Sequence, residues 1–170
     1  RDCSIQRRFQ KIIEESPAPE IEKSIINEMA ESAVNFVTNQ KYEGAGTIEF
    51  IYDIDNKRFY FLEMNTRIQV EHPVTEMITN SDLVSMQIQF ALNLDLKSIE
   101  QNKINKSGHA IECRLYAEDP AKNFLPSPGK ISKLKLPNTG FADIRLDIGV
   151  DEGDEISFYY DPMIAKIISK

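Results

Sequence analysis

Two short apolar runs, residues 47–53 and 58–64, constrain the fold of this chain more than any other feature. Both are rich in Ile, Phe and Tyr, and turn-forming residues separate them. The pattern predicts an antiparallel hairpin centred on Asn56, in which Phe50 faces Leu62. Side chains alternate between the two faces of a strand. One face should therefore be apolar core, made of Ile48, Phe50, Tyr52, Tyr60, Leu62 and Met64.

On the other face of this hairpin, Glu49 and Glu63 should lie directly opposite each other. Like charges at paired positions destabilise a strand pair, and at ~5 Å with an effective dielectric of ~20 the repulsion is about 3 kcal/mol. We therefore expect either a proton on one carboxyl group or a cation between the two. Asn65 follows on the same face, and two carboxylates with an amide oxygen suit Mg²⁺ or Mn²⁺. The alternative is a solvated face with both carboxylates in water.

Polar residues continue along the chain after this carboxylate pair. If the backbone stays extended beyond Glu63, then Asn65, Arg67, Gln69 and Glu71 all lie on one side of it. Arg67 would bind an oxyanion, Gln69 would add a donor, and Glu71 would accept a proton. The composition therefore suits an anion held beside the metal site, and the alternative is a solvated edge strand.

The remaining elements follow from periodicity and from Pro and Gly positions. A short extended stretch and a basic amphipathic segment occupy residues 1–16, and helices are predicted over 20–40 and 81–92, with a helical turn opening at Pro73. The pattern changes near residue 107 to short strands, predicted at 109–116, 130–136, 142–148 and 163–168. This change is the best candidate for a domain boundary.

Composition excludes several classes of function. The chain has 170 residues and a net charge of −7, which disfavours nucleic-acid binding because phosphate contacts need a basic surface. Its apolar runs are far shorter than the ~18 residues that span a bilayer, so no membrane association is expected. Cys3 and Cys113 have no metal-ligand spacing and are typical of free thiols in a reducing compartment. The chain opens without a Met and is expected to be part of a longer protein.

One long ungapped segment, residues 63–76, resembles the signature of the biotin carboxylases, which are ATP-grasp enzymes of acyl-CoA and pyruvate carboxylases. Separate stretches carry the same resemblance, at residues 1–8, 44–50, 112–114, 124–130 and 159–164. The resemblance implies an α+β fold. Residues 1–106 would be the C-terminal part of an ATP-grasp domain, an antiparallel sheet with helices, and residues 107–170 an incomplete, β-rich biotin carboxylase C-terminal subdomain.

The resemblance also implies a reaction and a set of roles. ATP and bicarbonate would form carboxyphosphate, and the carboxyl group would move to N1 of biotin carried on a protein. The family pattern implies metal ligands at Glu49, Glu63 and Asn65, nucleotide contacts at Gln6, Glu49, Ile51 and Glu63, bicarbonate contacts at Lys11, Arg67, Gln69 and Val70, and catalytic residues at Arg67, Glu71 and Arg114. In that pattern Glu71 is the base and Arg114 stabilises the biotin enolate. Without the resemblance, Arg114 is more simply interpreted as a surface ion pair with Glu112.

Partners and location follow from the same resemblance. It implies ATP and Mg²⁺ or Mn²⁺ as cofactors, with biotin as a carried co-substrate. A biotin carboxyl carrier, a carboxyltransferase and a second copy of the full-length protein would be the partners, in the cytoplasm or, in a eukaryote, the mitochondrial matrix. No biotinylation segment and no Gly-rich phosphate loop occur, so we expect these 170 residues alone to be inactive. Phe9 stands where many relatives carry His.

Two other classes of function stay open at this point. Another ATP-grasp ligase, such as a carbamoyl-phosphate synthetase-like or amino-acid ligase, would share the metal set. A non-enzymatic assembly module is the third interpretation.

Overall fold

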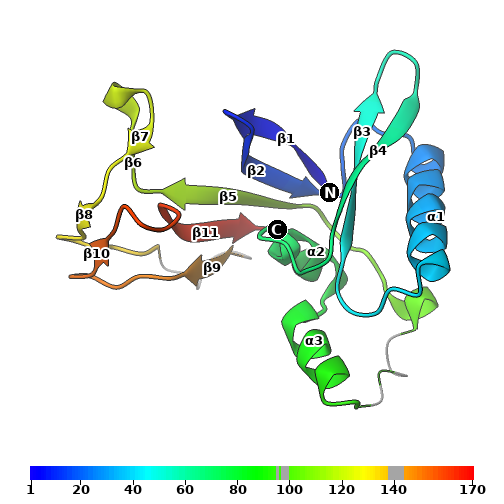
Figure 1. The fold of residues 1–170 in the computed structure, drawn as a ribbon. Coiled ribbons are helices and arrows are strands. Elements are labelled where there is room, and N and C mark those ends of the chain that lie inside the picture. The colour runs from blue at the N-terminus through cyan, green and yellow to red at the C-terminus, as the bar shows by residue number, and fades with distance from the viewer. Residues whose placement is uncertain (95, 97–99, 138–143) are drawn as a thin grey trace. The chain divides into compact units, whose positions relative to one another are not determined.

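A computed structural model of the chain describes residues 1–94, 96, 100–137 and 144–170 (Figure 1). These residues form two compact units. One comprises Arg1–Pro17 together with Gly108–Lys170, and the other comprises Ala18–Ser107. The antiparallel sheets and the helices confirm the predicted α+β class. Within the described residues, no helix is long and apolar enough to cross a membrane.

The first unit is built on a five-stranded antiparallel sheet with the order β1-β2-β5-β11-β9. Its strands are β1 (Asp2–Arg7), β2 (Gln10–Ser16), β5 (Ala110–Tyr116), β9 (Ile144–Ile148) and β11 (Met163–Ser169). Ala110 and Ile168 are fully buried and belong to its core. Smaller elements follow β5, namely β6 (Glu118–Asp119), η2 (Pro120–Lys122), β7 (Leu125–Pro126), β8 (Gly129–Lys130) and β10 (Glu155–Ile156).

The N-terminal segment is a β-hairpin of β1 and β2. The sequence predicts an extended stretch followed by a basic amphipathic segment, but it does not predict that the two pair. Arg8 and Phe9 form the turn with positive φ angles of 51° and 64°. Arg7 stabilises the turn region from one side, because it pairs with Glu118 and lies 4.0 Å from the centre of the Phe124 ring. β2 then pairs with β5, which ties the first residues of the chain to its C-terminal part.

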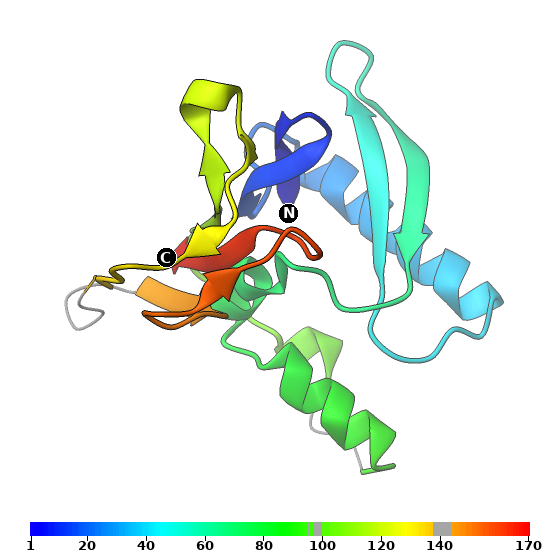
Figure 2. The same ribbon diagram turned by 60° about the vertical axis from the view of Figure 1, so that its left-hand side comes forward.

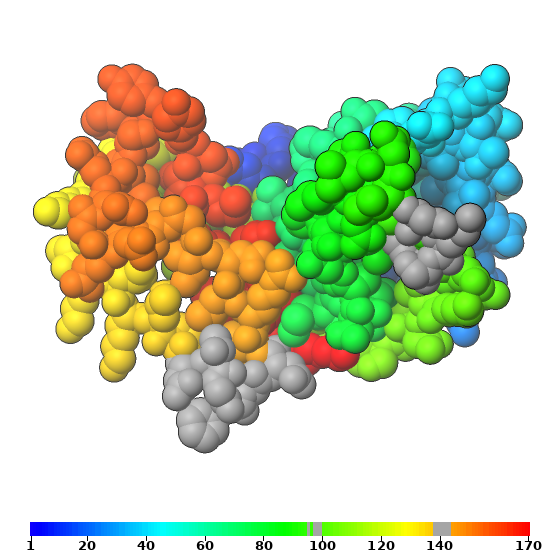
Figure 3. Space-filling model, turned by 90° about the horizontal axis from the view of Figure 1, so that it is seen from below, coloured from blue at the N-terminus to red at the C-terminus, as the bar shows by residue number. Residues whose placement is uncertain are grey.

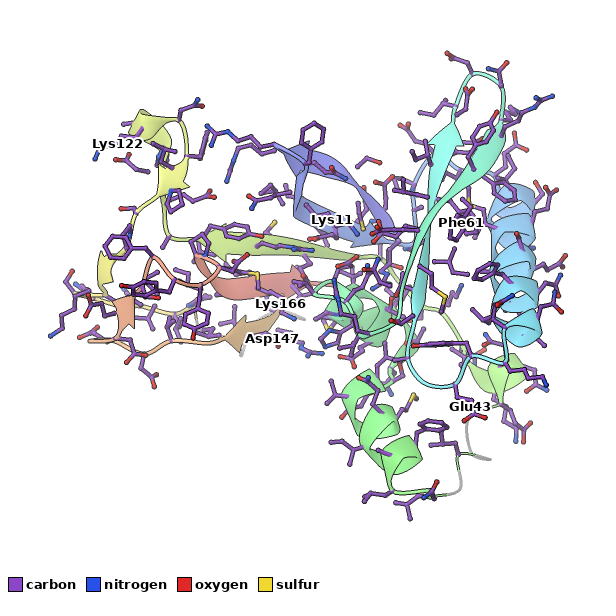
Figure 4. All side chains as sticks on the ribbon, viewed as in Figure 1. Lys11, Glu43, Phe61, Lys122, Asp147 and Lys166 are labelled. Carbon is purple, nitrogen blue, oxygen red and sulfur yellow. The ribbon has the colours of Figure 1, made fainter. Side chains whose placement is uncertain are left out.

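The second unit consists of helix α1 (Lys23–Asn39), the hairpin of β3 (Thr47–Asp53) and β4 (Arg58–Asn65), and helices α2 (His72–Thr79) and α3 (Leu83–Ala91), with η1 (Gln101–Lys103) near its end. Figures 1 and 2 both show α1 running alongside the hairpin. The ring centres of Phe36 in α1 and Phe61 in β4 are 5.5 Å apart, and Figure 4 shows Phe61 pointing toward the helix.

The predicted register of the hairpin is correct at one end and wrong at the other. Glu49 pairs with Glu63 as predicted, but Phe50 pairs with Phe61 instead of Leu62. The eight residues of β4 oppose the seven of β3, so one extra residue forms a bulge beside Leu62. A one-residue shift exchanges the two faces of a strand. Phe61 therefore meets Phe36 of α1, although Phe61 is 54% exposed. Tyr60 and Leu62, predicted as core, are 52% and 51% exposed, so this part of the core prediction is wrong.

The other predicted elements are mostly confirmed. Pro73 lies at the start of α2, and Asp82 caps α3 by accepting a hydrogen bond from the Ser85 amide at 2.8 Å. No residue of α3 is buried, and Figure 3 shows this helix, in green, at the surface of the second unit. The predicted strand over 130–136 is wrong, because residues 131–136 belong to no strand. Residues 142 and 143 of another predicted strand lie outside the described residues.

Candidate metal and anion site

The carboxylates of Glu49 and Glu63 face each other near the open end of the β3–β4 hairpin, on the far side of the bulge from the turn. Thr47 pairs with Asn65, and Ile48 with Met64, so the register around the two acids is the one predicted from the sequence. The bulge begins immediately after Glu49. Two acids are therefore held at a paired position of an antiparallel ladder, where their mutual repulsion must be offset.

Amide groups contact both carboxylates in the structure. Asn65 Nδ2 donates to Glu63 Oε1 at 2.9 Å and to Glu49 Oε1 at 3.2 Å, so it bridges the two carboxylates. Gln69 Nε2 donates to the same Glu49 oxygen at 2.6 Å. Hydrogen bonds to ionised acceptors are stronger than those between neutral groups. These amide hydrogen bonds add to the two solutions predicted from the sequence, a proton or a cation, and do not exclude either of them.

The cluster nevertheless fits a divalent cation. Two carboxylates and one side-chain amide converge, and rotation about the Cβ–Cγ bond of Asn65 exchanges Nδ2 for the ligand atom Oδ1. In the described part of the chain, no group of three His, Cys, Asp or Glu residues forms a metal site by itself. Mg²⁺ commonly uses one or two carboxylates and fills its remaining positions with water and substrate phosphates. The side chains would therefore supply only part of the coordination shell, and water and substrate phosphates would supply the rest.

The path of residues 66–72 differs from the extended run predicted from the sequence. β4 ends at Asn65, and the His72 amide donates to the carbonyl of Gln69 at 3.2 Å, which closes a turn before α2. Pro73 explains the change, because its fixed φ angle suits the first turn of a helix. Gln69 still reaches Glu49, but it does so through a turn rather than by strand alternation.

The predicted anion-binding residues occupy two different environments. Arg67 Nη2 donates to Asn65 Oδ1 at 3.4 Å, and Arg67 Nη1 donates to the carbonyl of Ile68 at 3.1 Å. Arg67 is exposed, whereas Gln69 and Glu71 are 5% and 2% exposed. Glu71 stands at the N-cap of α2, and Val70 lies in the turn before it. Strand β4 is therefore followed in the sequence by one exposed basic side chain, Arg67, and by two buried polar side chains, Gln69 and Glu71.

Arg114, predicted as a catalytic residue, lies in the first unit and pairs with Glu14. Arg114 Nε donates to Glu14 Oε1 at 2.6 Å, and Glu14 is completely buried. Burial alone would lower the pKa of Arg114, but Glu14 and Tyr116 outweigh it and the pKa is raised. Glu112 is also fully buried and lies directly opposite Glu14 in the β2–β5 ladder. Sequence reasoning missed Glu14, because no local signal shows which strand pairs with β5.

The remaining predicted site residues divide between the two units. Gln6 and Lys11 oppose each other in the β1–β2 hairpin of the first unit, and Gln6 Nε2 donates to the Cys3 carbonyl at 3.0 Å. Ile51 is in β3 of the second unit and is 55% exposed. The structure therefore brings together Glu49, Glu63, Asn65, Arg67 and Gln69 in one unit, and places Gln6, Lys11 and Arg114 in the other.

Comparisons with known families match nearly the whole chain. Residues 1–99 match the family described as carbamoyl-phosphate synthase L chain, ATP binding domain, and residues 112–170 match the biotin carboxylase C-terminal domain. Biotin carboxylase 1 of Bacillus subtilis is 53% identical over 169 residues, which are 99% of this chain and 37% of that protein. The mitochondrial methylcrotonoyl-CoA carboxylase subunit alpha of Mus musculus is 51% identical over 168 residues, again 99% of this chain but 23% of that protein.

Solved structures give the same result. The biotin carboxylase domain of a thermophilic 2-oxoglutarate carboxylase bound to bicarbonate has a TM-score of 0.91 and 46% identity, and covers 99% of this chain and 37% of its own. The corresponding domain dimer from Hydrogenobacter thermophilus, in complex with MgADP, ADP and bicarbonate, has a TM-score of 0.92 and 46% identity, with 99% and 36% covered. The chain therefore spans little more than a third of these relatives at most.

Proposed function

The chain belongs to the carbamoyl-phosphate synthase L chain ATP-binding domain family and, within it, to the biotin carboxylases, and from this premise we propose that it forms the metal- and bicarbonate-binding part of a biotin carboxylase. The full-length protein would use ATP and bicarbonate to make carboxyphosphate and would carboxylate N1 of protein-linked biotin. The observation that carries this proposal is the convergence of Glu49, Glu63, Asn65 and Gln69 at one end of the β3–β4 hairpin.

Each residue of the cluster would have a separate task. Glu49, Glu63 and Asn65 would hold Mg²⁺ or Mn²⁺. When bound, this cation would neutralise charge on the phosphates of ATP. Ile51, exposed on β3, would supply an apolar surface to the nucleotide base, with Gln6 as a further nucleotide contact. These residues would bind and orient the nucleotide rather than react with it.

The anion would be held and deprotonated by residues that follow the metal site. Arg67 would hold bicarbonate through two parallel N–H donors, and Gln69, the Val70 backbone and Lys11 would complete its contacts. Glu71 would take the bicarbonate proton, which leaves an oxygen able to attack the terminal phosphorus of ATP. Glu71 is 2% exposed, so bulk water has little access to the proposed base. Arg114 would stabilise the biotin enolate.

Partners follow from the family and from the limited length of the match. A biotin carboxyl carrier and a carboxyltransferase would complete the reaction cycle, and a second copy is proposed because one neighbour is described as a biotin carboxylase domain dimer. We expect the 170 residues alone to be inactive. Among the described residues, Cys3 and Cys113 take part in no disulfide, and a reducing compartment, the cytoplasm or the mitochondrial matrix, would suit them.

Replacing Glu71 by Gln in the full-length protein tests the proposed base. Gln keeps the shape and volume of Glu but accepts no proton, so we expect bicarbonate-dependent ATP hydrolysis to fall about 10²- to 10⁴-fold. Glu31→Gln is the matched control, because Glu31 is exposed on α1 and should leave the rate unchanged. Unaltered turnover in the Glu71→Gln enzyme would refute the base assignment. Product analysis separates the alternative ligases: carboxybiotin is expected, and carbamoyl phosphate would indicate the other chemistry.

A further inference from the structure

Asn65 links the proposed metal ligands to the proposed anion-binding arginine. Its Nδ2 donates to Glu63 Oε1 at 2.9 Å and to Glu49 Oε1 at 3.2 Å. Its Oδ1 accepts a hydrogen bond from Arg67 Nη2 at 3.4 Å. One amide group therefore contacts both halves of the site, with its donor end on the carboxylates and its acceptor end on the guanidinium.

A divalent cation is incompatible with this orientation of the amide. The amide nitrogen carries two hydrogens and no lone pair for a hard cation, whereas the amide oxygen has two lone pairs. A cation between the carboxylates would be repelled by the hydrogens of Nδ2. Rotation by half a turn about Cβ–Cγ removes that conflict, because Oδ1 then points to the cation.

The same rotation changes what Arg67 contacts. After rotation the NH₂ group of Asn65 faces the guanidinium, and Arg is a donor only. Two donors cannot bond to each other, so the Arg67–Asn65 hydrogen bond must break. Nη2 is then available to an anion, while Nη1 can keep its 3.1 Å bond to the carbonyl of Ile68.

We propose that Asn65 is a positioning residue with two orientations, which couples occupation of the divalent-cation site to release of Arg67 for bicarbonate. This inference rests on the proposed function, and it adds a communication between two of its ligands. The cation and the anion should each strengthen binding of the other by the same factor. Because the bond that breaks is long, at 3.4 Å, we expect a factor of about five, at the low end of known couplings.

The test measures Mn²⁺ binding to the full-length protein with a fixed saturating concentration of ADP, by electron paramagnetic resonance of free Mn²⁺. Saturating bicarbonate should tighten Mn²⁺ binding about fivefold. In Asn65→Asp, carboxylate oxygens serve the cation and Arg67 together without rotation, so the effect of bicarbonate should disappear. Asn102→Asp, a matched change at an exposed residue of η1, should keep the full coupling.

If the coupling came only from electrostatic attraction between the cation and bicarbonate, it would persist in Asn65→Asp. Coupling that persists in this variant therefore overturns the proposal. Absence of coupling in the unmodified protein overturns it as well. A second readout is independent of affinity: addition of Mg²⁺ should shift the side-chain amide resonance of Asn65 in an Asn-labelled sample. Glu63→Gln separates the two levels of inference. Weakened Mn²⁺ binding in that variant supports the metal site, whereas unchanged binding refutes the proposed function itself.

Discussion

Arg114→Met should destabilise the sheet of the first unit, because Arg114 neutralises a carboxylate that water does not reach. The Glu14 side chain has an exposure of 0%, and the Arg114 side chain has 11%. Removing one partner of a buried ion pair leaves an uncompensated charge and costs about 3–5 kcal/mol. Glu112 is also fully buried and lies opposite Glu14. Two buried acids then lack the cation, so we expect a loss of stability within this range of about 3–5 kcal/mol and not below it.

Hydrogen–deuterium exchange of peptides that cover β2 and β5 measures this loss locally in the full-length protein. A loss of 3 kcal/mol corresponds to about 150-fold faster exchange where opening of the sheet limits the rate. The double variant Glu14→Gln/Arg114→Met should recover about 2 kcal/mol, because the buried charge is gone. Arg114→Lys keeps a cation and should cost less than Arg114→Met.

Exchange in β2 and β5 that stays within about threefold of the unmodified protein would refute this reasoning, since it would mean that Glu14 tolerates the loss of its cation. Additive effects in the double variant would refute it too. The result also decides how activity data are interpreted. If the pair holds the sheet together, a loss of carboxylation in Arg114→Met reports stability as well as contact with biotin.

Two further outcomes follow from the first unit. Burial would raise the pKa of Asp147, but hydrogen bonds from Arg145 and from Lys166 outweigh burial and hold the pKa below 3.8. Figure 4 labels Lys166 beside Asp147. The stabilisation is thus present above pH 3.8 and lost as pH falls through the lower folded-state pKa, so chemical denaturation should show that Asp147→Asn destabilises at pH 7 and not in stronger acid. Desolvation first, and two neighbouring carboxylates second, raise the pKa of Cys113 above 9.0. In a Cys3→Ser background its rate of maleimide labelling should therefore still be rising above pH 9.0; a plateau below that pH would contradict the shift.

The Glu49–Glu63 pair could be predicted from sequence, but only because two departures cancel. The observed turn pairs Asp53 with Arg58, one position away from the register centred on Asn56. The bulge at Leu62 restores that register at Glu49 and Glu63. The bulge itself could not be predicted, because it depends on packing against a different element. It lets Phe61 meet Phe36 of α1 at 5.5 Å. Alternation assumes that every residue of a strand is paired, and it fails where packing favours one extra residue.

The Glu14–Arg114 pair shows a second limit. These residues are 100 positions apart, and they meet because β2 pairs with β5. Pairing between strands distant in sequence is decided by the whole fold, so a strand pattern around Arg114 identifies its face but not its neighbour. Local reasoning favours Glu112, two residues away on the same face, whereas the pairing of β2 with β5 brings in Glu14, which no local signal identifies.

The cluster around Asn65 explains why polar spacing alone cannot establish a metal site. Two opposed carboxylates need donors whether or not a cation is present, and Asn65 and Gln69 supply them in this structure. The same amides would be expected beside the acids in a protein that never binds a metal. The two cases differ in whether the Asn65 amide can turn its oxygen toward the carboxylates. In this structure Oδ1 faces Arg67 and accepts a hydrogen bond from Nη2 at 3.4 Å. A cation therefore competes with three hydrogen bonds of Asn65, the long one from Arg67 and the two that Nδ2 donates to Glu49 and Glu63. The last two bonds would be replaced by direct contacts of the same carboxylates with the cation.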